Sequence, residues 1–262
     1  MSRLLLIAHD HVSPGGAVEA RFVERGYEVE RALVVPEDRF EDPGVDFDFP
    51  DPRDYDAVLV LGALWGVYSE EVASWVKPEL ELLTTADEAG VPVFGICFGG
   101  QMLAQTHGGS VAPSPVTEIG PHVVTGVPEV AGVWMQWHND RFVAPPEATV
   151  IGQNAAAPQA FVLRRNLGVQ FHPEVDADGL AGWLENGGAD SAASRGLDPD
   201  VLLEHVRSLD PEIKPRAAAL VDYFLDVVAT TEVSEVEEAR RAVTKPEVEE
   251  ARRAVTKPEQ TP

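Results

Sequence analysis

The stretch VPVFGICFGGQMLAQTHGG, residues 91–109, is the most informative part of this 262-residue chain. An apolar run, Val91–Ile96, leads directly into Gly95-Ile96-Cys97-Phe98-Gly99, and a segment with helical spacing follows at once. A continuous apolar run of this length is typical of a strand buried on both faces of a parallel sheet. The stretch therefore predicts a strand, a sharp turn at Cys97 and a helix over Gln101–His107.

Strands and helices alternate along the first half of the chain, which is typical of a parallel sheet covered by helices. The strands are predicted at Arg3–Ala8, Tyr27–Val35 and Ala57–Leu61, and the helices at Gly15–Gly26 and about 70–89, the second interrupted at Pro78. Short strands and turns from Pro121 to Val175 predict a small β-rich extension that returns to the sheet edge. We therefore predict an α/β fold with an open, mostly parallel, doubly wound sheet and helices on both faces.

The end of the chain is a duplicated, charged tail. The sequence EVEEARRAVTKP occurs at 235–246 and again at 247–258. Each copy has Glu and Arg at helical spacing and ends in Pro, but its apolar content is too small for a core. We expect one domain over residues 1–230, which includes C-terminal helices over 179–229. Residues 231–262 are then a flexible or partly helical tail that does no chemistry.

Composition excludes several classes of partner. The formal net charge is −24, and so acidic a surface repels nucleic acid and anionic membranes. No run approaches the roughly 18 uncharged apolar residues that a membrane span needs. The apolar run in MSRLLLIAHDH ends at His9, too early for the core of a secretory signal. We expect a cytoplasmic protein that binds neither nucleic acid nor membrane.

Cys97 is the only cysteine, so an internal disulfide or a cysteine-based metal cage is impossible. In the predicted strand–turn–helix its thiol sits at a helix N-terminus, where the helix dipole favours a thiolate. Gly95 and Gly99 allow a sharp turn and a close approach of substrate. The amide of Phe98 points to the same place and could hold an oxyanion. The competing interpretation is a buried cysteine in a tight turn, and the glycine spacing alone leaves both open.

A second segment, Gln170-Phe171-His172-Pro173-Glu174, supplies a partner for the thiol. In extended backbone, residues two apart point the same way, so His172 and Glu174 share a face. Glu174 could hold the imidazole in one tautomer while the other ring nitrogen faces a thiol. An isolated His-x-Glu is more often incidental, but its position after an apolar strand and downstream of Cys97 makes the pair informative.

Together, GICFGGQ and QFHPE resemble the signature pair of class I glutamine amidotransferase domains, the family that includes the glutaminase part of GMP synthase. LGALWGVY, residues 61–68, resembles the loop that supplies a second oxyanion amide in that family. EIG at 118–120, QWHNDRF at 136–142 and QAF at 159–161 look like its stand-alone branch. The resemblance covers roughly residues 1–225 and implies a flavodoxin-like fold.

The resemblance implies a Cys-His-Glu triad that attacks a γ-carboxamide. Cys97 is then the nucleophile, His172 the general base and later the acid, and Glu174 the orienting carboxylate. The backbone at Phe98 and at Gly62 and Ala63 forms the oxyanion hole, and Gln101 contacts the glutamyl portion of the substrate. No metal and no organic cofactor is implied.

One departure from the family pattern concerns the oxyanion loop. Where the family usually has Gly-Gly-Pro, this chain has Gly62-Ala63-Leu64. Alanine and leucine tolerate fewer backbone conformations than glycine. If the loop requires a positive φ at Ala63, the oxyanion hole is misplaced or forms only with a partner.

Other polar and aromatic residues have less specific interpretations. His9, Asp10 and His11 follow a strand without a spaced third ligand region, so we expect solvated loop residues rather than a metal site. His138 and Asp140 fit an approach to the active site, a partner contact or a structural loop about equally. The tryptophans are expected to pack in the core, with Trp65 as a possible wall of the substrate pocket; they are Trp65, Trp75, Trp134, Trp137 and Trp183.

Three functions are consistent with these residues. The first is a glutaminase that supplies ammonia to a separate synthetase subunit, since the chain has no ATP-binding loop of the GxxxxGK[ST] type. The second is a self-sufficient hydrolase of the γ-glutamyl amide of a small amine. The third is a non-catalytic binding protein that keeps the fold, which an intact Cys, His and Glu set disfavours. The ammonia acceptor, the amine and the oligomeric state are not readable from the sequence.

Overall fold

A central sheet organises the protein in the computed structural model, which describes residues 1–231. Its strands are β1 Ser2–Ala8, β2 Tyr27–Leu33, β3 Ala57–Val60, β4 Val93–Ile96, β5 Ser110–Gly126, β6 Gly132–Val143, β7 Thr149–Gln153, β8 Pro158–Leu163 and β9 Asn166–Val169. The helices are α1 Gly16–Glu24, α2 Ala73–Ala89, α3 Phe98–Thr106, α4 Ala177–Trp183, α5 Ala189–Ala193 and α6 Pro199–Tyr223. Short helical turns are η1 Glu37–Arg39, η2 Pro52–Asp54, η3 Glu70–Val72, η4 Leu184–Gly188 and η5 Phe224–Val228. The predicted tail lies outside the described residues, apart from Thr231.

The strand order is β2-β1-β3-β4-β9-β8-β7-β5-β6 in one nine-stranded sheet. The first five strands are parallel, and the pairs from β9 to β6 are antiparallel. The predicted α/β fold is confirmed. The β-rich extension is the antiparallel half of the same sheet, because β8 pairs directly with β9.

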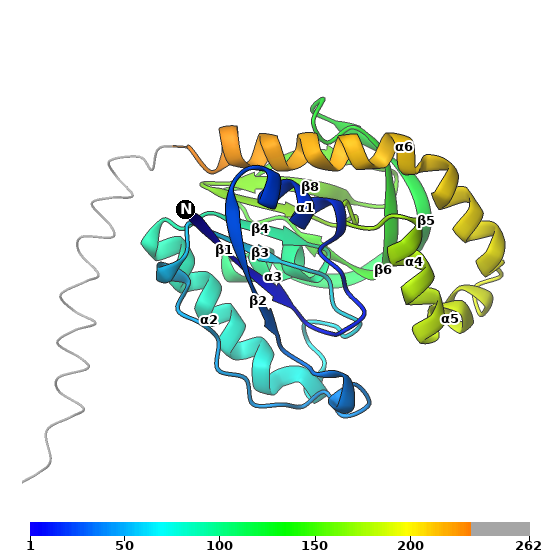
Figure 1. Ribbon diagram of the computed structural model, residues 1–262, viewed down its shortest axis with the longest axis horizontal. Helices are drawn as coiled ribbons and strands as arrows, with labels where there is room; N and C mark the ends of the chain where they lie inside the picture. Colours follow the sequence, from blue (N-terminus) through cyan, green and yellow to red (C-terminus); the bar gives the residue numbers. More distant parts are fainter. Residues whose placement is uncertain (232–262) are drawn as a thin grey trace, which may run out of the picture. The chain divides into compact units, whose positions relative to one another are not determined.

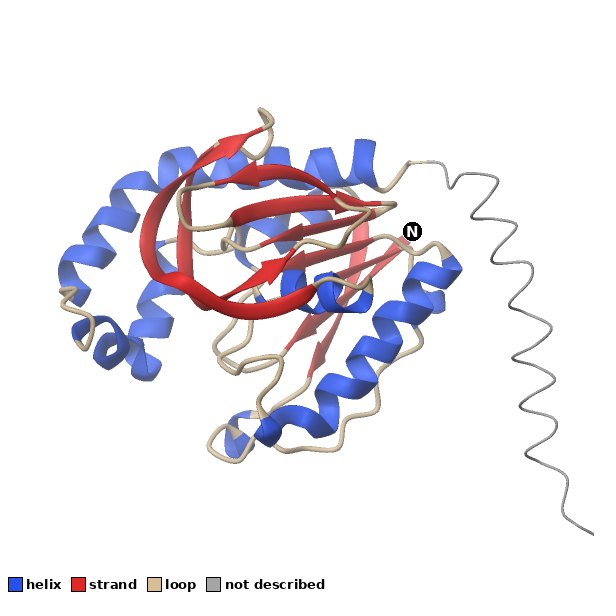
Figure 2. Ribbon diagram, turned by 180° about the vertical axis from the view of Figure 1, so that it is seen from behind, coloured by secondary structure: helices blue, strands red, loops and turns tan. Residues whose placement is uncertain are grey.

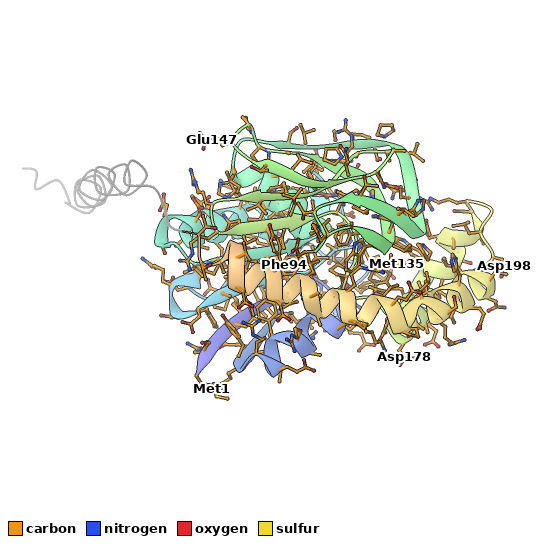
Figure 3. All side chains as sticks on the ribbon, turned by 90° about the horizontal axis from the view of Figure 1, so that it is seen from above. Met1, Phe94, Met135, Glu147, Asp178 and Asp198 are labelled. Carbon is orange, nitrogen blue, oxygen red and sulfur yellow. The ribbon has the colours of Figure 1, made fainter. Side chains whose placement is uncertain are left out.

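Helices cover both faces of the parallel half, as Figures 1 and 2 show from opposite sides. Alternate residues of the buried strands face opposite sides, so Leu4 and Leu6 of β1 pack with α1 and α6, whereas Leu5 and Ile7 pack with α2 and α3. Phe94 of β4 lies beneath α6, where its ring contacts Phe224 at 5.4 Å between centroids (Figure 3). The strands β3, β4 and β9 and most of β1 are therefore buried on both faces, whereas the edge strand β2 is partly exposed.

Helix α2 continues through Pro78, where the sequence predicts an interruption. Pro78 is the sixth residue of the helix, and an interior proline costs about 3 kcal/mol. The helix buries Trp75, Leu82 and Leu83 against the sheet, and each such side chain contributes roughly 1.5–3 kcal/mol. Their combined burial exceeds the cost of the proline, so the helix persists.

Among residues 1–231, no helix is both long enough and apolar enough to cross a membrane.

Candidate active site

Cys97 lies in the turn between β4 and α3, in a backbone conformation that is rare for a side-chain-bearing residue. Its φ is 51° and its ψ is −102°. The neighbouring glycines are required by close packing: a Cβ on Gly95 would lie 2.5 Å from the carbonyl carbon of Gly99. A Cβ on Gly99 would lie 2.4 Å from the carbonyl oxygen of Val60. The strand and the helix therefore cross at van der Waals distance, and this crossing keeps Cys97 in its strained turn.

Direct pairing of β4 with β9 brings the segment of His172 to Cys97. The Cys97 amide donates to the carbonyl of Val169 at 2.8 Å, at the end of β9. The His172 amide donates to the carbonyl of Met135 on β6 at 2.8 Å. Backbone hydrogen bonds thus hold both predicted catalytic residues at the carboxyl ends of parallel strands, where α/β folds place their sites.

His172 and Glu174 form the buried pair that the sequence predicts. The Nδ1 of His172 lies 2.7 Å from Oε1 of Glu174, and both side chains are almost fully buried. The other ring nitrogen, Nε2, is buried without a well-formed hydrogen bond, although the Cys97 thiol lies close enough to affect the imidazole. The edge of the imidazole packs against Trp183, with ring centroids 4.9 Å apart. The ring is thus oriented by one carboxylate and one aromatic wall.

Protonation of His172 depends on opposing effects. Burial alone lowers the pKa of His172, but the charges of Glu174 and Cys97 and the hydrogen bond to Glu174 outweigh it and raise this pKa to about 10. At neutral pH the imidazole therefore carries a proton. An imidazolium beside a cysteine is the arrangement that stabilises a thiolate.

The raised pKa of His172 predicts a pH-dependent stability. The unfolded-state pKa is near 6.5 and the folded one is about 10, so the folded state retains a proton that the unfolded state loses. The stabilisation is complete below pH 6.5 and is lost as pH rises through about 10. We expect the free energy of unfolding, measured with denaturant at pH 6.5 and pH 10, to fall more in the wild type than in His172→Gln. Equal falls in the two proteins would contradict this pKa.

The predicted oxyanion loop follows β3 and lies beside both residues. A Cβ on Gly62 would lie 3.0 Å from Cε1 of His172 and 3.8 Å from Cβ of Cys97, so only glycine fits there without moving the imidazole. The carbonyl of Leu61 accepts from the amide of Gly99 at 3.2 Å, which ties the loop to α3. The non-glycine residues with positive φ within residues 1–231 are Cys97 and Arg164. Ala63 therefore adopts an ordinary conformation, and the loss of the family's second glycine introduces no backbone strain.

His9 and Glu79 lie under this loop, which contradicts the expectation of solvated loop residues after β1. His9 is fully buried, with Nδ1 2.9 Å from the carbonyl oxygen of Gly62 and Nε2 3.0 Å from Oε2 of Glu79. Burial lowers the pKa of His9, but the charge and hydrogen bonds of Glu79 and the carbonyl of Gly62 raise it overall. No cluster of three or more His, Cys, Asp or Glu suited to a metal ion occurs in the described part of the chain.

Two glutamines lie next to the thiol. Gln170, at the end of β9, donates from Nε2 to the sulfur of Cys97 at 3.6 Å. Gln101 of α3 is buried and donates to Oε1 of Gln170 at 3.4 Å and to the carbonyl of Asp140 at 3.3 Å. The structure thus brings Gln101 to the site through Gln170, and its predicted contact with substrate stays a prediction. Sequence reasoning quoted Gln170 within QFHPE but assigned it no role.

A buried polar network connects the motifs EIG at 118–120, QWHNDRF at 136–142 and QAF at 159–161. Glu118 on β5 accepts from Gln159 on β8 at 3.1 Å and lies 3.4 Å from Nε2 of His138 on β6. Burial raises the pKa of Glu118, but His138, His122 and Asn154 together outweigh it and the pKa is lowered overall. His138 also lies 3.0 Å from Oε1 of Gln136. His138 is thus buried on a strand with its ring held by neighbouring side chains.

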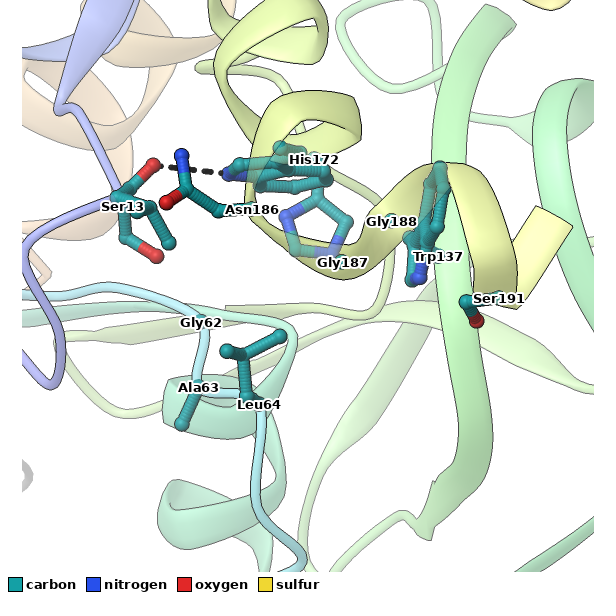
Figure 4. Close-up of a pocket in the computed structure, with 12 residues that line it drawn as sticks. Ser13, Gly62, Ala63, Leu64, Trp137, His172, Asn186, Gly187, Gly188 and Ser191 are labelled. Atoms are coloured by element: carbon teal, nitrogen blue, oxygen red, sulfur yellow. Dashed lines mark hydrogen bonds between the residues drawn. The ribbon is translucent and has the colours of Figure 1, made fainter. Parts of the chain in front are cut away.

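Beside His172 lies a pocket of about 220 Å³. Figure 4 shows residues that line it, among them the loop Gly62–Leu64, His172, Trp137 and the turn 186–188. The aromatic lining comes from Trp137 and Trp183, whose rings meet edge to face at 5.9 Å. Trp65 packs against Trp75 at 6.0 Å, as expected of the tryptophans, and is not among the residues that line this pocket.

Comparison with known sequences identifies the family. The model described as "Glutamine amidotransferase class-I" matches residues 17–180. The chain is 41% identical over 138 residues to the glutamine-hydrolysing GMP synthase of Thermomicrobium roseum, across 48% of this chain and 26% of that protein. Its counterpart from Aeropyrum pernix is 36% identical over 169 residues, across 58% of this chain and 30% of that protein. The chain thus matches less than a third of the length of these relatives.

Comparison with solved structures also finds glutamine amidotransferases. A glutamine amidotransferase from Thermotoga maritima has a TM-score of 0.74 and 28% identity, and the match covers 86% of this chain and 98% of that chain. A glutamine amidotransferase from Methylobacillus flagellatus has a TM-score of 0.72 at 22% identity, over 90% of this chain and 98% of that one, and supports the fold. Because the family model spans more than half of the chain, this protein belongs to the class-I glutamine amidotransferase family.

Proposed function

We propose that this protein hydrolyses the γ-carboxamide of glutamine through a thioester on Cys97, with His172 and Glu174 completing the triad. The observation that carries the proposal is the buried imidazole of His172, held at 2.7 Å by Glu174 on one nitrogen and facing the Cys97 thiol with the other. A non-catalytic protein would gain little stability from a buried cysteine, histidine and glutamate, because burying three ionisable groups costs desolvation energy.

The steps follow from the geometry. The Cys97 thiolate attacks the γ-carbon, and amides of Phe98 and of the Gly62–Ala63 segment hold the oxyanion. The amide of Phe98 lies in the first turn of α3, where helical N–H groups have no acceptor within the helix. His172 gives its proton to the leaving nitrogen, and the C–N bond breaks to release ammonia and a γ-glutamyl thioester. His172 then takes a proton from water, which hydrolyses the thioester to glutamate and restores the thiolate.

The ammonia acceptor is proposed to lie outside the residues that carry the glutaminase. The curated relatives are GMP synthases, of which this chain matches about a quarter to a third. We therefore propose that the released ammonia is consumed by a synthetase domain or subunit that activates its own substrate.

The direct test is glutamine hydrolysis by the purified protein, with glutamate and ammonia measured together. We expect the two products in equal amounts from glutamine and none from asparagine, whose side chain is one methylene shorter. A folded protein that releases no glutamate, alone or with a candidate synthetase, would contradict the proposal.

A second candidate function is hydrolysis of the γ-glutamyl amide of an apolar amine. The pocket beside His172 favours it, because the leaving nitrogen must lie next to the general acid and the lining there is aromatic, aliphatic or neutral, apart from His172 itself. A free ammonia molecule needs no such walls, whereas an aromatic amine would bury its ring against Trp137 and Trp183.

This candidate predicts turnover of γ-glutamyl-benzylamide. We expect Ser191→Phe, which fills the pocket from α5, to lower kcat/KM for the benzylamide at least tenfold relative to kcat/KM for glutamine. Measured release of benzylamine and of ammonia gives this ratio. If the benzylamide is not cleaved, or the ratio does not change, the pocket does not hold a leaving group and simple glutamine hydrolysis stands.

A further inference from the structure

His9 lies directly behind the predicted oxyanion loop, and both of its ring nitrogens face hydrogen-bond acceptors. Nδ1 is 2.9 Å from the carbonyl oxygen of Gly62, and Nε2 is 3.1 Å and 3.0 Å from the two carboxylate oxygens of Glu79. A carbonyl oxygen only accepts, so Nδ1 donates to Gly62, and the carboxyl group of Glu79 holds the other ring nitrogen. The interaction is fully buried, because His9 and Glu79 have no solvent exposure.

The bond to Gly62 determines which way one peptide unit points. In a trans peptide the C=O and the following N–H point in opposite directions within one plane. Since the carbonyl of Gly62 points to His9, the N–H of Ala63 points away from His9. This peptide borders the site, because a Cβ built on Gly62 would lie 3.0 Å from Cε1 of His172 and 3.8 Å from Cβ of Cys97.

Phe98, whose amide is the other proposed oxyanion donor, also contacts His9. The imidazole of His9 meets the ring of Phe98 edge to face at 4.6 Å between centroids, and it stacks on Trp75 at 5.3 Å. Glu79 comes from α2, which packs on the same face of the sheet as α3. One imidazole thus links the loop after β3, the first residue of α3 and the helix α2.

We propose that His9, held by Glu79, is a positioning residue that fixes the Gly62–Ala63 peptide with its N–H directed at the oxyanion. This inference rests on the proposed glutaminase function and adds a role for two residues outside the triad. A purely structural role explains the pair less well, because a buried ion pair is usually no more stabilising than apolar residues of the same volume. It also accounts for an ordinary backbone at Ala63: the hydrogen bond to His9 sets the peptide orientation without requiring a second glycine.

Two amide side chains can separate the two hydrogen bonds of His9. The nitrogen of asparagine occupies the place of Nδ1, and that of glutamine occupies the place of Nε2. His9→Asn therefore keeps the donor to Gly62 and leaves Glu79 without a partner, whereas His9→Gln keeps the donor to Glu79 and frees the Gly62 carbonyl. A positioning role predicts that activity follows the Gly62 bond, whereas a structural role predicts that it follows stability.

The experiment measures kcat and KM for glutamine, together with Tm, in the wild type and both variants. We expect His9→Gln to lower kcat about tenfold to a hundredfold, somewhat less than deletion of an oxyanion donor, with KM within about twofold of the wild type. His9→Asn should keep kcat within about threefold although its Tm is the lower of the two. Alkylation of Cys97 by iodoacetamide should stay unchanged in both, since His172 is untouched.

A double variant keeps the test informative if His9→Asn does not fold. His9→Asn combined with Glu79→Gln removes the unpaired carboxylate and is expected to keep the near-wild-type kcat. Equal kcat values in His9→Gln and in the asparagine variants, or kcat values that follow Tm, would overturn the positioning role. Glutamine hydrolysis by the wild type would then still support the proposed function, so the two failures are distinguishable.

Discussion

Replacing Cys97 with alanine is expected to reduce glutamine hydrolysis by about 10⁴-fold or more, to the background of the assay. The thioester cannot form without the sulfur, and neither His172 nor the oxyanion loop can replace it. The side chain is small and buried, so the loss of one sulfur should lower Tm by only a few degrees. Ammonia release and the thermal unfolding curve are measured on the same preparation.

Cys97→Gly is the matched control for this variant. The wild-type φ of 51° is costly for any residue with a Cβ, by about 1–2 kcal/mol, and free of cost for glycine. We therefore expect the glycine variant to be as inactive as the alanine variant but more stable than it, which separates the loss of the thiol from the strain of the turn. Residual turnover above background in both variants would mean that Cys97 is not the nucleophile.

Replacing His172 with alanine should have the second largest effect. We expect kcat for glutamine to fall about 10³-fold to 10⁴-fold, because the variant lacks both the partner of the thiolate and the acid that protonates the leaving nitrogen. Iodoacetamide should alkylate Cys97 more slowly at pH 7 than in the wild type, since the imidazolium that stabilises the thiolate is gone.

Glu174→Gln is expected to have an intermediate effect, between the wild type and His172→Ala. The amide can hold the ring through its oxygen or present an N–H to Nδ1 and favour the wrong tautomer, so we expect a smaller loss in kcat than for His172→Ala. The rate at which iodoacetamide alkylates Cys97 should lie between the rates for the wild type and for His172→Ala. Unchanged alkylation in His172→Ala would show that the imidazole and the thiol are not coupled, and the proposed triad would then be wrong.

The residues that sequence reasoning located share one property: their geometry follows from short local patterns. The turn at Cys97 depends on a strand, two glycines and a helix start, all within a few residues. His172 and Glu174 are two residues apart, and their side chains meet at 2.7 Å, although Pro173 and Glu174 lie in a turn and not in the extended backbone that the sequence predicts. The parallel half of the sheet follows from apolar runs such as Ala57–Leu61, which are long enough to read directly.

The residues that it missed are joined across large separations. His9 and Glu79 lie 70 residues apart, and neither segment carries a pattern that brings a buried carboxylate under a loop. The pocket walls Trp137 and Trp183 come from β6 and α4, so their approach depends on how the antiparallel half folds back. Helix α2 shows the same limit, because its local signal at Pro78 is outweighed by packing that only the folded protein contains.

The pairing of β4 directly with β9 has a consequence for how such an enzyme can diversify. The register that sets Ile96 opposite Val169 determines the spacing of the segments that carry Cys97 and His172. The chain between them, from β5 to β8, leaves that register untouched, however long its hairpins become. Insertions and new loops can therefore be added in these hairpins while the proposed catalytic pair keeps its spacing.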